Sequence, residues 1–363
     1  MTASITISEE PEAAVVDILT TLLSEGRVAA VITLCKKSNG IAYSLISDPA
    51  ELEKAVPLCP LMPSNLGQIL GRLTIRQPFN EPVAVVARPC ELRGFVELVK
   101  RQQGCLDNIL IISHICGGVY PLEDEVRGEI NELLPGYWKS VEEKEIDPGL
   151  RPACRSCVEF VPYTADITVK VPGGERSTII MLNTPWSQEM LDGLYPKGTD
   201  EELDMDIISS IRESREGERK NIFAEYAEPE GLEGLVDIFG RCIGCHACSK
   251  ACPICYCTLC TFESPVSELS PEDYEKEVGK KGGMRVPPDT VYFHLGRMSH
   301  IGISCVACGS CQDVCPVDIP ISILFKKVSE SIQGMFDYVP GRDPDEKLPV
   351  CTFEMEEFRE VED

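Results

Sequence analysis

The sequence predicts an α/β domain followed by a small α+β module that carries most of the cysteines. Three observations lead to this prediction. The chain has 363 residues, 43% of them hydrophobic, which is enough for two or more domains with packed cores. Its first half alternates short apolar runs with segments of helical periodicity. Of its 19 cysteines, seven lie before residue 158, eleven lie within residues 242–315, and Cys351 stands alone.

The first 74 residues predict a helix, two strands and a second helix. Apolar residues recur at helical spacing from Val15 to Leu23, and Gly26 is a suitable stop for that helix. Residues 27–34 and 40–48 predict two strands around a polar turn. Residues 66–73 repeat apolar side chains at helical spacing, so a helix should follow the loop PLCPLMPSN.

The next segments extend the same pattern. Residues 83–88 predict a short buried strand that runs through Pro89 into a helix, and residues 108–114 predict another buried strand. This order of strand, helix and strand indicates a parallel sheet covered by helices. Residues 165–171 and 177–182 predict a later hairpin.

Composition divides the chain into four predicted parts. We expect an α/β domain at 1–195, a charged helical connector at 196–234, the cysteine-rich module at 235–340 and an acidic tail at 341–363. A run of charges such as the connector is more often a solvated face than a docking surface. The tail is expected to wrap the surface or meet a partner.

Charge and hydropathy exclude several classes of protein. The 59 acidic and 34 basic residues give a net charge of −25, which argues against a nucleic-acid binder. No apolar run is long enough for a transmembrane segment, and the N-terminus does not resemble a signal peptide. A large, cysteine-rich chain of this kind is expected in the cytoplasm, where cysteines favour metal sites over disulfides.

The strongest motif is a pair of cysteine runs with identical spacing. Cys-x2-Cys-x2-Cys-x3-Cys-Pro begins at Cys242 and again at Cys305, which is the spacing of bacterial ferredoxins with two [4Fe–4S] clusters. In such proteins the fourth cysteine of each run binds the other cluster. We therefore predict one cluster on Cys242, Cys245, Cys248 and Cys315, and a second on Cys252, Cys305, Cys308 and Cys311. The module should then be a bacterial-type dicluster ferredoxin.

The N-terminal cysteines offer a third site on weaker grounds. Cys154 and Cys157 form a CxxC pair, Cys90 begins a predicted helix, and Cys116 follows a predicted strand. Cys59 and Cys105 compete for the remaining positions. By spacing alone, a third cluster is no better supported than a redox-active or simply buried CxxC pair.

Several stretches resemble one known family: VAVVARPCELRGFVELVKR, RPACRSCVEFVPYTADITV, GRCIGCHACSKACPICYC, HLGRMSHIGISCVACGSCQDVCPVDIP and YVPGRDPDEKLPVCTFEMEEF. Together they resemble the beta-subunit family of coenzyme F420-reducing hydrogenases and formate dehydrogenases, in members with a C-terminal dicluster ferredoxin. The resemblance covers most of the chain outside the connector. It implies an N-terminal domain with FAD and a third [4Fe–4S] cluster, whose ligands would be Cys90, Cys116, Cys154 and Cys157.

The flavin contacts are less visible in the residues. Ser64 and Asn65, at the start of a predicted helix, and Arg88 and Arg93 are candidate cofactor-binding residues. Ser64 could instead be a helix N-cap, and Arg88 could instead pair with Glu91. Better-known hydrogenase members of the family carry a Gly-Thr-Pro-Cys turn, in which Arg88 replaces the threonine. This difference leaves the identity of the hydride carrier undecided.

The sequence therefore predicts an iron–sulfur flavoprotein subunit of an anaerobic oxidoreductase complex. Its expected partners are a hydrogenase or formate dehydrogenase catalytic subunit, or a heterodisulfide-reductase-like flavoprotein. One alternative is a flavin-free electron-transfer adaptor, and another is an NAD(P)H-linked flavoenzyme. Cys255, Cys257 and Cys260 have no assigned role. Between a small buried side chain and an additional ligand, we expect the buried side chain.

Overall fold

The structure is a computed structural model that describes residues 3–38, 40–122, 124–171, 177–196, 198, 203–226, 229–265 and 269–351, the side chains of 124–129 and 350 excepted. Its strands are β1 (Ala3–Ile7), β2 (Ala30–Lys37), β3 (Gly40–Ile46), β4 (Val83–Val86), β5 (Ile109–His114), β6 (Ile167–Val169) and β7 (Thr178–Leu182). The helices of the first part are α1 (Pro11–Ser24), α2 (Leu66–Thr74), α3 (Pro89–Lys100), α4 (Asp124–Glu143), α5 (Pro152–Arg155) and α6 (Pro185–Met190).

The later helices carry the connector and the cysteine-rich module. They are α7 (Met205–Glu225), α8 (Gly231–Phe239), α9 (Ala247–Lys250), α10 (Pro271–Lys281), α11 (Thr290–Ile301), α12 (Ser310–Asp313) and α13 (Ile321–Met335). Short 3₁₀ turns complete the list: η1 (Pro49–Lys54), η2 (Thr261–Glu263), η4 (Gly302–Ser304) and η5 (Pro349–Cys351).

The strands form one mixed sheet in the order β1-β7-β6-β5-β4-β2-β3. Its centre, β2-β4-β5-β6, is parallel, and the outer pairs are antiparallel. The predicted parallel sheet and the β6–β7 hairpin are thus confirmed. Strand β1 was not expected; it pairs with β7 and closes one edge of the sheet.

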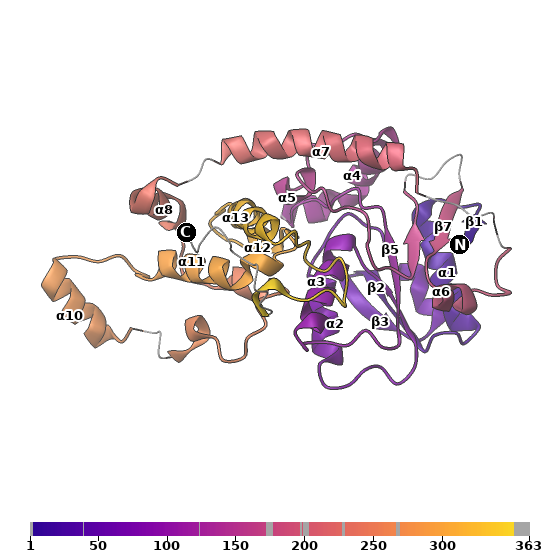
Figure 1. The fold of residues 1–363 in the computed structure, drawn as a ribbon, viewed down its shortest axis with the longest axis horizontal. Helices are drawn as coiled ribbons and strands as arrows, with labels where there is room; N and C mark the ends of the chain where they lie inside the picture. The colour runs from indigo at the N-terminus through magenta and orange to yellow at the C-terminus, as the bar shows by residue number, and fades with distance from the viewer. Residues whose placement is uncertain are drawn as a thin grey trace, which may run out of the picture.

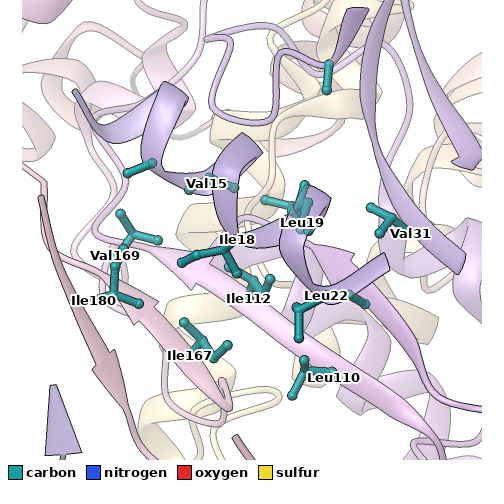
Figure 2. Packing of buried hydrophobic residues seen from close by; sticks show 14 of the residues in the cluster. Val15, Ile18, Leu19, Leu22, Val31, Leu110, Ile112, Ile167, Val169 and Ile180 are labelled. Carbon is teal, nitrogen blue, oxygen red and sulfur yellow. The ribbon is translucent and has the colours of Figure 1, made fainter. Parts of the chain in front are cut away.

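Helices cover both faces of the sheet because its central strands are apolar on both sides. Leu110 and Ile112 of β5 point to the face covered by α1, where Ile18, Leu19 and Leu22 pack against them (Figure 2). The intervening residues Ile109 and Ile111 point to the other face, where α2 and α3 pack. This alternation is the two-residue period of a strand, so both layers follow directly from the sequence of β5.

The rest of the chain lies beside this α/β domain. Helix α7 runs along one side of the molecule, from the sheet toward α8 (Figure 1). The described residues of the cysteine-rich module contain helices and 3₁₀ turns without a strand, whereas we expected an α+β module. Within the part of the chain that the structure describes, no helix has the length and apolar content to cross a membrane.

The α1 layer gives a first testable prediction. Leu19 is fully buried between α1 and the sheet, whereas Leu45 on β3 is 60% exposed. We expect Leu19→Ala to lower the free energy of unfolding by about 2–5 kcal/mol, because it leaves a cavity that the packed layers cannot close. Leu45→Ala is the control and should change it by less than about 0.5 kcal/mol. Anaerobic unfolding curves measure both, and equal losses would contradict the layer assignment.

Candidate functional site

The two cysteine runs of the module fold into the same loop twice. In the first run, Gly244 and His246 have positive φ angles of 67° and 55°. In the second run, Ala307 and Gly309, at the equivalent positions, have φ angles of 54° and 84°. His246 and Ala307 are in the left-handed region despite their side chains, which is uncommon and marks a conformation imposed by the site.

These turns direct backbone donors at the cysteine sulfurs. The Gly244 N–H donates to the Cys242 sulfur at 3.4 Å, and this bond opposes the rise that burial causes in the pKa of Cys242. The Ala307 N–H acts in the same way on the pKa of Cys305, again against the effect of burial. Hydrogen bonds from N–H groups to cluster sulfurs are one of the means by which a protein sets a cluster potential. The loops therefore suit an anionic sulfur cluster.

The neighbours of each thiol follow the crossed pattern predicted from spacing. Burial raises the pKa of Cys248 to about 11, and among nearby thiolates those of Cys242, Cys315 and Cys245 raise it further. Cys315 belongs to the second run, yet it lies with the first three cysteines of the first run. The first predicted quartet is therefore together in the structure.

The second predicted quartet surrounds a small cavity. Its walls include all four sulfur-bearing residues, Cys252, Cys305, Cys308 and Cys311. Among the described residues, no three Cys, His, Asp or Glu side chains converge as ligands of a single metal ion. A cluster of four irons is larger than a single ion, so its four thiolate ligands are spread around it and do not converge on one point. The lining, with four cysteine side chains around one shared space, suits such a group.

One buried cation accompanies the first quartet. Arg297 of α11 is 3% exposed and donates through Nη1 to the Cys248 sulfur at 3.1 Å and through Nη2 to the Cys248 carbonyl at 3.1 Å. Its guanidinium also lies over the Phe325 ring. A permanent cation in this position offsets the negative charge of thiolates. Nothing in the cysteine spacing pointed to Arg297.

The four N-terminal cysteines also gather. Burial raises the pKa of the Cys90 thiol well above its ordinary value, and the neighbours that raise it further include Cys308, Cys116 and Cys154. Burial likewise raises the pKa of Cys154 to about 11, with Cys116 and Cys157 among its neighbours.

The two competing cysteines lie elsewhere. Cys59 is buried, with Arg88 and Glu12 as its charged neighbours, and the backbone N–H of Cys105 donates to Thr74. Cys90, Cys116, Cys154 and Cys157, the four ligands that the resemblance implies (the N-terminal quartet), are thus neighbours in the structure, and Cys59 and Cys105 are not among them.

The loops of this quartet are tied together by the connector. Arg215 of α7 donates through Nη2 to the carbonyls of Cys116 at 2.9 Å and Gly117 at 3.0 Å, and through Nη1 to that of Cys157 at 3.4 Å. It also lies over the Phe160 ring. We expected a solvated face here, and one side of α7 is instead part of the site. Arg215 was not singled out because it belongs to a charged run.

Buried contacts hold the N-terminal quartet against the second ferredoxin loop. Arg151 pairs with Asp313 at 3.1 Å, with both side chains under 5% exposed, and donates to the Cys308 carbonyl at 2.9 Å. Lys326 of α13 donates to the backbone carbonyl and hydroxyl of Ser156, inside the CxxC pair. A Cβ at Gly309 would lie 2.9 Å from Arg151 Cδ, so the close approach needs a glycine.

The predicted flavin-binding residues are mostly engaged within the chain. Arg88 is buried; it pairs with Glu91 at 3.4 Å and donates to the carbonyls of Cys59 and Leu61, which favours the alternative interpretation. Arg93 donates to the Pro340 carbonyl at 2.8 Å, where the end of the cysteine-rich module contacts α3.

At the start of α2 the N-cap is one residue later than we considered. Asn65 caps the helix through Gly67, whereas Ser64 is exposed and is not the cap. Asn65 Nδ2 is buried without a hydrogen-bond partner among the described residues.

The three surplus cysteines line a cavity of about 820 Å³ between α2 and the module. Cys257 is exposed, and Cys255 and Cys260 are partly exposed, so the expectation that they are buried is wrong for Cys257. The loop CPICYCTLC leaves the cluster region after Cys252 and runs along the cavity wall, which explains the exposure.

The buried ion pair gives a second prediction. Asp313→Ala leaves Arg151 buried without its carboxylate, and we expect a loss of about 3–5 kcal/mol. The double variant Arg151→Met with Asp313→Leu should recover much of that loss because no uncompensated charge remains.

The midpoint of anaerobic thermal unfolding and the rate of proteolysis are the measurements. Arg155→Gln is the control, because the Arg155–Glu218 pair is partly exposed and should contribute less than about 1 kcal/mol. A loss in Arg155→Gln as large as that in Asp313→Ala would contradict this account.

The Arg215 bonds give a third prediction. Arg215→Gln removes the donors to three carbonyls of the N-terminal cysteine loops, so the quartet should lose its ordering while the ferredoxin loops keep theirs. We expect lower iron content and faster alkylation of Cys116 and Cys157 after anaerobic purification. Lys220→Gln, an exposed position on the same helix, is the control. Unchanged iron and alkylation in Arg215→Gln would show that α7 is dispensable for the site.

Comparisons with known proteins identify the family of the chain and its dicluster domain. Residues 238–319 match the family described as 4Fe-4S dicluster domain. The chain is 28% identical over 336 residues to the F420-dependent formate dehydrogenase subunit beta of Methanocaldococcus jannaschii, covering 83% of each chain. It is 31% identical over 307 residues to F420-dependent formate dehydrogenase 1 subunit beta of Methanococcus maripaludis, covering 74% of each chain.

A solved structure is also similar, at a lower level. A chain of the F420-reducing [NiFe] hydrogenase complex from Methanosarcina barkeri matches with a TM-score of 0.43 and 13% identity, over 64% of this chain and 95% of that chain. That likeness is too low to support an argument. The identity to the curated relatives, over most of both chains, is sufficient: the chain belongs to the family of F420-dependent formate dehydrogenase beta subunits and carries a C-terminal [4Fe–4S] dicluster ferredoxin domain.

Proposed function

We propose that the chain is an iron–sulfur flavoprotein subunit that passes electrons between a hydride carrier, FAD and three [4Fe–4S] clusters. Coenzyme F420 is the proposed carrier, because the curated relatives are named as F420-dependent. The proposed setting is an anaerobic cytoplasm. The proposed partner is a catalytic subunit of formate dehydrogenase or hydrogenase type, or a heterodisulfide-reductase-like flavoprotein.

The observation that carries this proposal is the contact between the two cysteine regions. Among the charges around Cys90, that of Cys308 has the largest effect on its pKa after burial itself, although Cys308 lies in the ferredoxin module. Cys311 in turn has Cys248 of the first quartet among its neighbours. These neighbours support a series of the three proposed quartets: N-terminal quartet, second quartet, first quartet. A series of close one-electron centres is the arrangement that an electron relay needs.

The chain holds this series rigid with buried polar contacts. Arg151 and Lys326 join the loops of the N-terminal and second quartets. At the edge of α3, the Gly341 N–H donates to Glu97 at 2.9 Å, and Lys100 donates to the Tyr338 hydroxyl at 2.8 Å. These bonds attach the tail to the α/β domain. FAD, when bound, would accept the two electrons of a hydride together and release them singly to the clusters.

An iron and flavin assay tests the proposal. Anaerobically purified protein should contain about twelve irons, from three clusters of four, together with releasable flavin. The double variant Cys154→Ser with Cys157→Ser should contain about four fewer irons. Cys351→Ser is the matched control, because Cys351 is exposed and belongs to none of the quartets.

The outcomes separate the alternatives. About eight irons with no flavin would favour the flavin-free adaptor. Bound flavin that is bleached by NADH or NADPH, and not by reduced F420, would favour the NAD(P)H-linked enzyme. An unchanged iron count in the CxxC variant would remove the third cluster from the proposal.

A further inference from the structure

Arg297 of α11 lies between the two ferredoxin quartets. Its Nη1 donates to the sulfur of Cys248, in the first quartet, at 3.1 Å. Burial lowers the pKa of Arg297, but the thiolates of Cys248, Cys255, Cys252 and Cys311 together hold it above its ordinary value. Cys252 and Cys311 belong to the second quartet. One buried cation is therefore close to both quartets and hydrogen-bonded to a sulfur of the first.

The guanidinium of Arg297 is held in this position by two rings and a second hydrogen bond. It lies 5.0 Å from the centroid of the Phe325 ring and 5.6 Å from that of the Phe293 ring. Its Nη2 donates to the Cys248 carbonyl at 3.1 Å, so one cysteine is bound at two points. The negative charges that act on Arg297 most are thiolates and not carboxylates. A carboxylate partner would cancel most of its field, whereas here the charge acts on the sulfurs.

Other cations near the module act more weakly because they are exposed. Arg297 lines the cavity of about 820 Å³ between α2 and the module, and Arg72 and Arg76 of α2 line the same cavity. Arg72 and Arg76 are exposed, so water and salt weaken their fields. Arg297 is 3% exposed, and its charge acts in surroundings of lower dielectric constant. The cavity is basic, but its effect on the sulfurs comes mainly from Arg297.

The neutral donors do not distinguish the quartets in the same way. The N–H groups of Gly244 and Ala307 occupy equivalent places in the two loops, at Cys242 and at Cys305. The hydroxyl of Ser310 lies 3.5 Å from the Cys308 sulfur in the second quartet, but a neutral hydroxyl adds no charge. Arg297 is thus the feature in which the two quartets differ most.

A buried cation changes how readily an iron–sulfur cluster takes up an electron. Reduction adds a negative charge, so a nearby cation and hydrogen bonds to the sulfurs both raise the reduction potential. The first quartet receives the charge of Arg297 and a hydrogen bond from it, and the second receives the charge alone. A cluster on the first quartet should therefore have the higher potential of the two.

We propose that Arg297 sets the order of the two ferredoxin potentials, so that an electron is held most readily at the first quartet. Arg297 acts through Cys248 and is a positioning residue. An electron that moves from the second quartet to the first oxidises one cluster and reduces the other, with no further reactant. Cys245 of the first quartet is exposed, so the electron is held at the end of the series that another protein can reach. This inference rests on the proposed function, because it needs a cluster on each quartet.

A redox titration of the full chain, followed by EPR after anaerobic purification, tests the proposal. Arg297→Gln removes the charge, and the higher ferredoxin midpoint should fall by about 59 mV or more, which is tenfold in a one-electron equilibrium. The lower ferredoxin midpoint should fall by less, and that of the N-terminal cluster should not change. The double variant Cys154→Ser with Cys157→Ser identifies the N-terminal midpoint, because it lacks that cluster.

Two further variants separate an electrostatic role from a structural one. Arg297→Lys keeps the charge and loses one of the two bonds to Cys248, so its fall should be smaller, about threefold in the same equilibrium. Arg72→Gln is the matched control, because it removes the same charge from the same cavity at an exposed position. It should change each equilibrium by less than about twofold.

Iron content completes the test. Where Arg297→Gln contains less iron than the unaltered protein, Arg297→Lys with full iron decides the question by its midpoint. Unchanged midpoints at full iron content, equal falls of all three midpoints, or loss of iron from both Arg297 variants overturn the proposal and leave the proposed function intact. An unaltered protein without three reducible clusters overturns the relay of the proposed function instead.

Discussion

The arrangement of the molecule depends on buried cations that lie against the cysteine loops. Arg151, Arg215 and Lys326 each donate to backbone carbonyls of these loops, and Arg297 donates to a cysteine sulfur. Burying a cation is costly unless negative charge or acceptors compensate for it. Four neighbouring thiolates repel one another, and nearby cations reduce that repulsion. The two sets of charges therefore stabilise each other, and neither is favourable without the other.

This mutual dependence explains why distant parts of the chain meet at the site. Arg215 comes from the connector, 58 residues after Cys157, and Lys326 comes from α13, 170 residues after Ser156. Each cation joins a helix to a loop that has little regular structure of its own. The connector is thus a structural part of the N-terminal quartet, although its outer face remains charged and exposed. Arg151 adds a bond to the Cys308 carbonyl, and Cys308 is close enough to Cys90 to raise the pKa of its thiol, so the contacts that stabilise the loops lie where the proposed relay passes.

Most of the fold and the two ferredoxin quartets were predictable because they follow local patterns in the sequence. Alternation in β5 and helical spacing in α1 predicted the layers, and the repeated cysteine spacing predicted the crossed ferredoxin quartets. The N-terminal quartet has no such spacing and was implied only by the family resemblance. The cations were not predictable in this way. Arg215 lies within a charged run, and Arg151 has the appearance of any arginine beside a proline. Their roles depend on tertiary contacts between distant segments, for which a single sequence has no spacing signal.

The acidity of the chain and the basic cavity are compatible because electrostatic attraction in salt solution is local. At physiological ionic strength the field of an exposed charge falls off over about 8 Å, so the net charge of −25 has little influence inside a cavity lined by arginines. Arg297 is better shielded from solvent, and its attraction for an anion is weakened less by salt than that of Arg72 or Arg76. The outer acidic surface acts on a different class of ligand. An acidic surface attracts a protein with a basic face more strongly than it attracts a small anion, which supports a basic protein surface as the proposed outer partner.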